Sequence, residues 1–98
     1  MKITYKNNTV KKICTIAQFA ERKLGRNMAD KIHQRIDEIS GADTIEQMIQ
    51  YSVGKCHPLT GDREGEYAMH LVEPYRLVFE KRGNEVQIAH IIEIVDYH

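Results

Sequence analysis

The sequence predicts a single α+β domain in which one face of an antiparallel sheet packs against an N-terminal helical hairpin. Apolar residues recur at helical spacing in the first half of the 98-residue chain, whereas they recur at a period of two in the second half. A loop rich in Gly, Pro and Asp separates the two patterns. The length suits one domain over residues 1–98 and is too short for two.

The first half predicts a short strand at residues 3–5 and then helices. A turn at residues 7–9 can cap the first helix, Gly25 ends it, and Gly41 ends the second helix. The apolar stripes of these two helices are Val10, Ile13, Cys14, Ala17, Ala20 and Leu24 in the first, and Met28, Ala29, Ile32, Ile36 and Ile39 in the second. A third, short helix capped by Asp43 follows.

The second half predicts the sheet. Residues 67–72 and 75–80 alternate in polarity as strands do, and Glu73 and Pro74 form the turn between them. A tight hairpin at residues 82–84 leads into a long apolar strand at 86–95. The N-terminal strand is expected to join this sheet.

Composition and charge limit the classes of function. Hydrophobic residues make up 42% of the chain and charged residues 29%, as in an ordinary globular protein. The 14 Lys and Arg balance 14 Asp and Glu, so a surface that binds nucleic acid all over is excluded. Nine basic and four acidic residues lie in positions 1–40, against five and ten in 41–98. This division predicts either a local basic surface or simply a solvated helix surface.

The sequence also predicts the compartment. No apolar run approaches the roughly 20 residues that span a bilayer, and the start lacks the pattern of a signal peptide. We therefore expect a cytoplasmic protein without a membrane partner, in which Cys14 and Cys56 are reduced thiols. Cys56 and His57 are adjacent, which is not a spacing that zinc sites favour, so neither a metal nor a cofactor is predicted.

Several residues carry side chains suited to chemistry. The loop before the sheet contains Lys55 and His57, and imidazole titrates near neutral pH. The end of the sequence supplies a carboxylate, an aromatic ring and a second imidazole in Asp96, Tyr97 and His98.

Arg76 lies beside an apolar run and needs a partner, because burying an unpaired guanidinium costs roughly several kcal/mol. One explanation is a salt bridge, for which the candidate carboxylates are Glu80, Glu93 and Asp96. The other is an anion clamp, because the planar guanidinium binds phosphate oxygens through two hydrogen bonds. The residues alone leave both explanations open.

The segment CHPLTGDREGEYAMHLVEPYRLVFE and the final IIEIVDYH resemble the HigB, or plasmid maintenance killer, branch of the RelE superfamily. KKIC after the first strand and KLG between the helices agree with it. The resemblance extends over essentially the whole chain, and the loop-to-strand motif with the terminal DYH is its most specific part. It implies a compact RelE-like sheet with a helical hairpin on one face.

The resemblance also implies an activity and partners. Members of the branch are ribosome-dependent endoribonucleases that inhibit translation and growth. They prompt a 2′-hydroxyl of messenger RNA to attack the adjacent phosphate, and they need no metal. The expected partners are a helix-turn-helix antitoxin of the HigA kind, the ribosome and messenger RNA. Operator DNA is expected to bind only the toxin–antitoxin complex.

The resemblance carries roles to particular residues. The implied catalytic residues are His57, Arg76, Asp96 and His98, and the implied RNA-binding residues are Arg63, Tyr97 and Lys55. Arg76 would stabilise charge on the phosphorane, while the two histidines would share the acid and base roles. Asp96 would orient a histidine or act as base, and Tyr97 would stack on a base of the codon.

Two other functions fit the same sequence. One is a ParE-like toxin that inhibits DNA gyrase without being an enzyme. The other is a structural or regulatory protein with no activity, such as a decayed toxin. Convergence of His57 and residues 96–98 on Arg76 would favour the nuclease, because toxins of the gyrase-inhibiting kind generally lack such a set.

Overall fold

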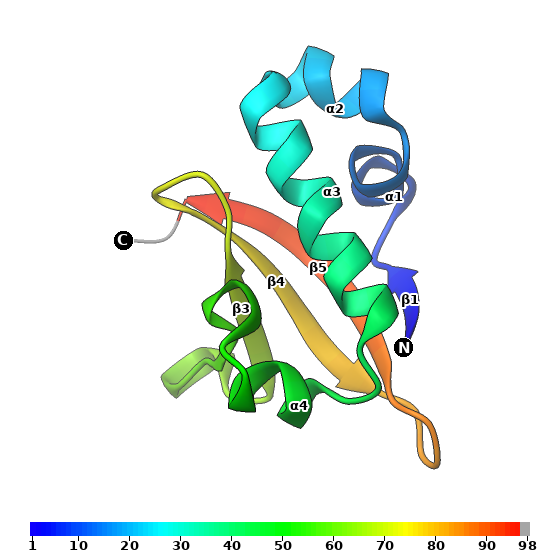
Figure 1. Cartoon of the computed structure of the whole chain (residues 1–98), viewed down its shortest axis with the longest axis vertical. Coiled ribbons are helices and arrows are strands. Elements are labelled where there is room, and N and C mark those ends of the chain that lie inside the picture. Colours follow the sequence, from blue (N-terminus) through cyan, green and yellow to red (C-terminus); the bar gives the residue numbers. More distant parts are fainter. Residues whose placement is uncertain (97–98) are drawn as a thin grey trace.

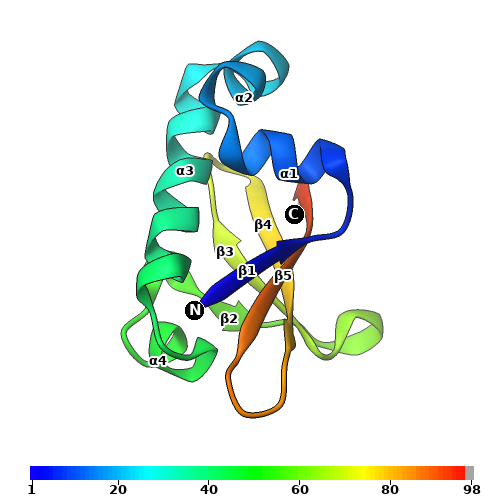
Figure 2. The same ribbon diagram turned by 90° about the vertical axis from the view of Figure 1, so that its right-hand side faces the viewer.

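The computed structural model describes residues 1–96 and confirms the α+β architecture. The helices are α1 (Asn8–Thr15), α2 (Ala17–Leu24), α3 (Arg26–Gly41) and α4 (Ile45–Gln50). The strands are β1 (Lys2–Tyr5), β2 (His57–Pro58), β3 (Glu66–His70), β4 (Tyr75–Arg82) and β5 (Ile88–Asp96). They form one sheet in the order β1-β5-β4-β3-β2, and α3 lies along one face of it (Figures 1 and 2).

The sheet is mixed rather than wholly antiparallel. β1 runs parallel to β5, with Lys2 opposite Ile88 and Tyr5 opposite Ile91, whereas the other neighbouring strands are antiparallel. A parallel pair needs a long crossover connection, and here the helices and the other strands supply it. β5 therefore lies between β1 and β4, and the first strand of the chain meets the last described strand.

The helical half differs from the expectation in two places. The first expected helix is two helices, because Ile16 adopts an extended conformation (φ −120°, ψ 106°) between α1 and α2. Gly25 ends α2 as expected, with a φ of 84°. α4 is capped by Thr44 rather than Asp43, since the Thr44 side chain accepts a hydrogen bond of 3.0 Å from the Gln47 amide.

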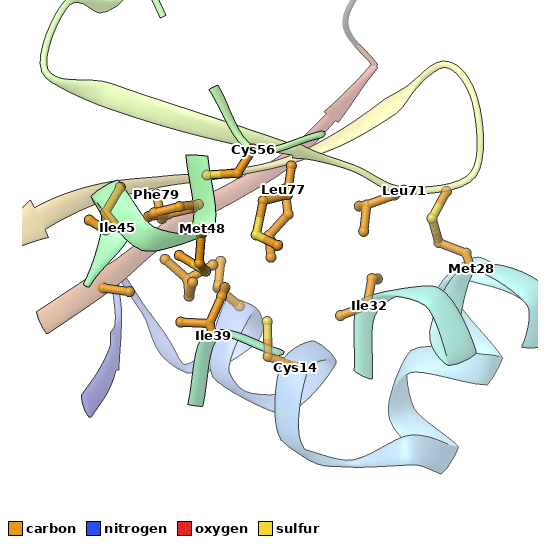
Figure 3. Close-up of a cluster of buried hydrophobic side chains, with 14 residues drawn as sticks. Cys14, Met28, Ile32, Ile39, Ile45, Met48, Cys56, Leu71, Leu77 and Phe79 are labelled. Carbon is orange, nitrogen blue, oxygen red and sulfur yellow. The ribbon is translucent and has the colours of Figure 1, made fainter. Parts of the chain in front are cut away.

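The main core lies between the helices and one face of the sheet (Figure 3). Ile32 and Ile39 of α3 and Cys14 of α1 belong to one cluster with Leu77 and Phe79 of β4, and the helix side chains point toward the sheet. Both β4 side chains are fully buried, and burying an apolar side chain of this size contributes about 1.5–3 kcal/mol. This packing fixes β4 and, through its pairing, the strands on either side.

The opposite face of the sheet, called the second face below, is defined by alternation along the strands. It carries Ala68, His70, Arg76, Val78 and Val95, while their neighbours on β3 and β4 point into the main core. Ala68 and Val78 are fully buried beneath Leu59 of the preceding loop. A bulge between Val78 and Phe79 shifts the pairing of β4 with β5. Within residues 1–96, no helix has both the length and the apolar character needed to cross a membrane.

Candidate active site on the second face

A strained turn positions His57 at the start of β2. Ser52, Gly54 and Lys55 all have positive φ values, of 51°, 56° and 54°, and two of them are not glycine. This turn aims the Lys55 carbonyl at His57, whose Nδ1 lies 2.8 Å from the carbonyl oxygen. Because a carbonyl can only accept, Nδ1 carries the proton. The neutral His57 ring therefore keeps its lone pair on Nε2, where it can act as a base.

His70, at the end of β3, is brought against His57 by strand pairing. His57 lies opposite Ala68, and the two imidazole rings meet edge to face with centroids 6.0 Å apart and planes at 72°. The His70 Nδ1 donates to Glu73 Oε1 at 3.0 Å. Burial lowers the pKa of His70 and the positive charges of Arg76 and Lys55 add to this, while the hydrogen bond to Glu73 opposes it. His70 is therefore biased toward the neutral ring.

Arg76 completes the row, since it lies directly opposite His70 on β4. Its side chain is only 13% exposed, and its Nη1 donates to Glu73 Oε2 at 3.1 Å and to the Tyr75 carbonyl at 2.9 Å. The Arg76 guanidinium, followed by His70, holds the pKa of Glu73 below its usual value. Glu73 thus bridges Arg76 and His70 with its two carboxylate oxygens, and it is not one of the carboxylates named from the sequence as partners of Arg76.

The C-terminal end of β5 reaches the same end of the sheet. Val95 lies opposite Arg76, and Asp96 lies opposite Tyr75. Successive residues of a strand point to opposite faces, so Asp96 points to the same face as Tyr75 and not to the second face. Asp96 is therefore close to the row along the strand, but its carboxylate lies on the other side of the sheet. Asp96 is exposed. Tyr97 and His98 lie outside the described residues, and their expected roles stay predictions.

The two basic residues expected to contact RNA differ in their surroundings. Arg63 is held by two carboxylates, with 2.7 Å between its Nε and Glu66 Oε1 and 2.7 Å between its Nη2 and Glu93 Oε1. These carboxylates, with Glu66 first, raise the pKa of Arg63. Lys55 is exposed on the strained turn, and its charge acts on His70. Lys55 is therefore the better placed of the two to meet a phosphate.

The sequence prediction missed His70 and Glu73. His70 was on a strand whose inward face the alternating pattern could not identify, because apolar residues stand at both sets of positions in 67–72. One signal was available. Glu73 is three residues from His70 and three from Arg76, across the turn that joins two strands, so it can reach both.

The described residues give no sign of a metal centre. Among residues 1–96, no three His, Cys, Asp or Glu side chains are grouped closely enough to hold an ion. Cys14 and Cys56 are buried free thiols, and burial raises their pKa values to about 12 and about 11. Neither cysteine is therefore a thiolate nucleophile at neutral pH.

No family model matches the chain. A curated relative, endoribonuclease HigB of Proteus vulgaris, is 32% identical over 69 residues, which cover 70% of this chain and 71% of the relative.

Solved structures agree in fold. A YoeB/ParE toxin from Agrobacterium tumefaciens superposes over 100% of both chains with a TM-score of 0.68 at 19% identity. YoeB from Staphylococcus aureus, described as a dimer, superposes over 100% of this chain and 97% of its own with a TM-score of 0.62 at 20% identity. The solved structures show that the chain shares the fold of the YoeB and ParE toxins, and the sequence relative shows that it belongs to the HigB endoribonuclease family.

Proposed function

We propose that this protein is the toxin of a toxin–antitoxin pair and cleaves messenger RNA on the ribosome in the cytoplasm. The observation that carries the proposal is the row of His57, His70 and Arg76 across the second face, with Glu73 orienting the last two. A row of imidazole and guanidinium groups suits a reacting phosphodiester, which needs proton transfer and positive charge at the same point. The HigB relative, named an endoribonuclease, supports the same reaction class.

In the proposed reaction, the 2′-hydroxyl of one nucleotide attacks the adjacent phosphorus and the bond to the 5′-oxygen breaks. The products are a 2′,3′-cyclic phosphate, which can open to a 3′ phosphate, and a free 5′-hydroxyl. The step needs a base, an acid and a cation for the extra negative charge, and it requires no metal or cofactor. Arg76 is the cation, because its planar guanidinium can bind two phosphoryl oxygens.

His57 and His98 share the base and acid roles in this proposal. The hydrogen bond from Nδ1 to Lys55 leaves Nε2 of His57 as the reacting nitrogen. The role expected of Asp96, to orient a histidine or to take the proton itself, requires its carboxylate to turn back toward the row, because alternation along β5 places Asp96 on the other face. His70 lies between His57 and Arg76, and as a neutral ring it can pass a proton between a water molecule and the substrate.

The remaining assignments concern RNA binding and partners. Tyr97 stacks on a base of the codon, and Lys55 and Arg63 contact phosphates. A neutral chain binds RNA weakly by itself because phosphate contacts supply most of the affinity, so the ribosome positions the message. A cognate helix-turn-helix antitoxin restrains the toxin, and the complex, rather than the toxin alone, binds operator DNA.

The test is primer extension on a reporter message after induction of the wild type and of two variants, Arg76→Gln and His57→Gln. Wild type should cut within codons, and loss of Arg76 should reduce cleavage by about 10²–10³-fold, the usual cost of removing one stabilising donor. His33→Gln is the matched control, because His33 is on α3 and bonds the Ile13 carbonyl at 3.1 Å. Its cleavage should equal that of wild type.

Purified variants must keep their unfolding midpoints, since Arg76 also has a structural bond to Glu73. If induced cells keep the message intact but contain broken DNA, the proposed nuclease function is wrong and the protein inhibits DNA gyrase instead. An intact message without growth arrest would point to an inactive chain.

A further inference from the structure

Arg35 of α3 is a buried arginine that contacts the candidate site from the helical side of the sheet. The residue is only 9% exposed, and it lies among the buried residues of the helix. Its Nε donates to the backbone carbonyl of His70 at 2.7 Å, and its Nη1 contacts Glu38 Oε1 at 2.7 Å on the same helix. The guanidinium therefore links the helical layer to the strand residue that stands between His57 and Arg76.

The carbonyl of His70 depends on this donor because of where the strands end. Leu71 donates its amide to Tyr75 of β4 at 3.0 Å, so the backbone groups of His70, one residue earlier, point away from β4. On that side the neighbour is β2, which pairs only as far as His57 opposite Ala68. His70 lies beyond the end of β2, and Arg35 supplies the hydrogen bond that a longer strand would have made.

The same side chain also supports the strained turn. A Cβ added to Gly54 would lie 2.6 Å from Arg35 Nε and 2.8 Å from Arg35 Cδ, far inside contact distance. The turn that contains Gly54 and Lys55 therefore packs directly on the Arg35 side chain. Lys55 in turn fixes the His57 ring through its carbonyl oxygen.

Stability alone does not explain a buried Arg35. A buried ion pair adds little net stability, and apolar residues of similar volume often replace one without loss. We infer that Arg35 is a positioning residue: it holds the turn that carries His57 and the end of the strand that carries His70 in one fixed arrangement. The inference rests on the proposed nuclease function for its kinetic consequence, whereas the positioning itself can be measured without activity.

The experiment compares wild type with Arg35→Met and Arg35→Lys. Single-turnover cleavage on programmed ribosomes should fall about tenfold or more in Arg35→Met at saturating toxin, with an unchanged concentration dependence, because a buried side chain does not touch RNA. Arg35→Lys keeps the charge beside Glu38 and should recover part of the rate. The side-chain NMR resonances of His57 and His70 should move in Arg35→Met, and those of His90 should not.

Gly54→Ala provides a second approach that leaves Arg35 in the sequence. Its new methyl group must displace the Arg35 side chain, so the same resonances should move and cleavage should fall. Gly25→Ala is the matched control. Gly25 also has a positive φ, of 84°, but nothing lies within 4 Å of an added Cβ there. This variant should lose stability without loss of cleavage per folded molecule.

Three outcomes decide the matter. Folded Arg35→Met and Gly54→Ala with unchanged histidine resonances and unchanged cleavage would overturn the inference. If Arg35→Met does not fold, Arg35→Lys and Gly54→Ala decide by the same two measurements. If wild type cuts no RNA, the proposed function fails, and the histidine resonances alone then show whether Arg35 positions the two rings.

Discussion

The imidazole rings of His57 and His70 meet edge to face with their centroids 6.0 Å apart, although His57 begins the short strand β2 and His70 ends the core strand β3. The contact exists because β2 places His57 opposite Ala68, two residues before His70 on β3. Burial of the His70 ring favours its neutral form, and the charges of Arg76, Glu73 and Lys55 also act on its pKa. These charges can be changed one at a time.

Replacing Glu73 by Gln should lower the pKa of His70 further. The Glu73 carboxylate raises that pKa through its hydrogen bond and its charge, against the effect of burial. The neutral amide keeps the shape and loses the charge. The measurement is an NMR titration of the His70 ring at low and high salt, since the Glu73 side chain is 65% exposed and its charge is screened by salt. An unchanged His70 titration would show that the bridge does not form in solution.

Stability should decrease as the pH falls through 6.5 because of His90. This side chain is 9% exposed and its Nδ1 lies 2.8 Å from Thr4 Oγ1. Burial, then the charge of Arg82, lowers its pKa from 6.5, while Glu80 opposes the shift. The unfolded chain then binds the proton more tightly than the folded one, so the stabilisation is complete above 6.5 and lost toward the lower folded-state pKa.

Urea unfolding at about pH 7.5 and about pH 5.5 measures this effect. His90→Gln should show a smaller loss between the two pH values than wild type. The remaining loss should belong to His70, whose pKa is lowered in the same direction. If wild type and His90→Gln lose the same unfolding free energy between the two pH values, His90 does not contribute to the pH dependence.

Arg63 should bind RNA only by leaving its carboxylates. If it contacts a phosphate, Glu93→Gln should tighten the binding of a short single-stranded RNA by freeing the guanidinium from one partner. Arg63→Gln should weaken binding and reduce the slope of log affinity against log salt by about one. The opposite result, unchanged affinity with a lower free energy of unfolding in Arg63→Gln, would make Arg63 a purely structural link between Glu66 and Glu93.

Both cysteines should resist thiol reagents in the folded protein. Burial leaves Cys14 2% exposed and Cys56 4% exposed, and it raises their pKa values to about 12 and about 11. Since the thiolate is the reacting form, labelling by an aromatic disulfide at neutral pH should be slow until urea is added. Ile16→Cys, at a position that is 47% exposed, is the control that should react at once. Immediate labelling of native wild type would contradict the buried arrangement.

Much of the fold follows from patterns within short segments. The change from helical spacing to alternation predicts the order of helices and strands, and Gly25 correctly marks the end of α2. The break at Ile16 is not predictable, because no Gly or Pro stands there and tertiary packing decides the turn. The parallel pairing of β1 with β5 joins residues about 86 positions apart, for which local periodicity carries no information.

Parts of the candidate site can be proposed from the sequence where a residue type has few structural uses. A partly buried strand arginine such as Arg76 is expected to pair with a carboxylate. The identity of that carboxylate depends on the turn between the strands, which places Glu73 beside Arg76. Arg35 could not be anticipated, since a helix arginine is ordinarily exposed and only the end of β2 creates its role.

The central place of β5 has a consequence for synthesis. Because β5 joins β1 to β4, a nascent chain that has not yet made residues 88–96 holds two separate pieces of sheet. Contacts between distant segments form late, after the intervening chain has been ordered. The strand that lies beside Arg76 is thus translated after β1, β3 and β4, so the sheet cannot close around the candidate site until β5 has been made.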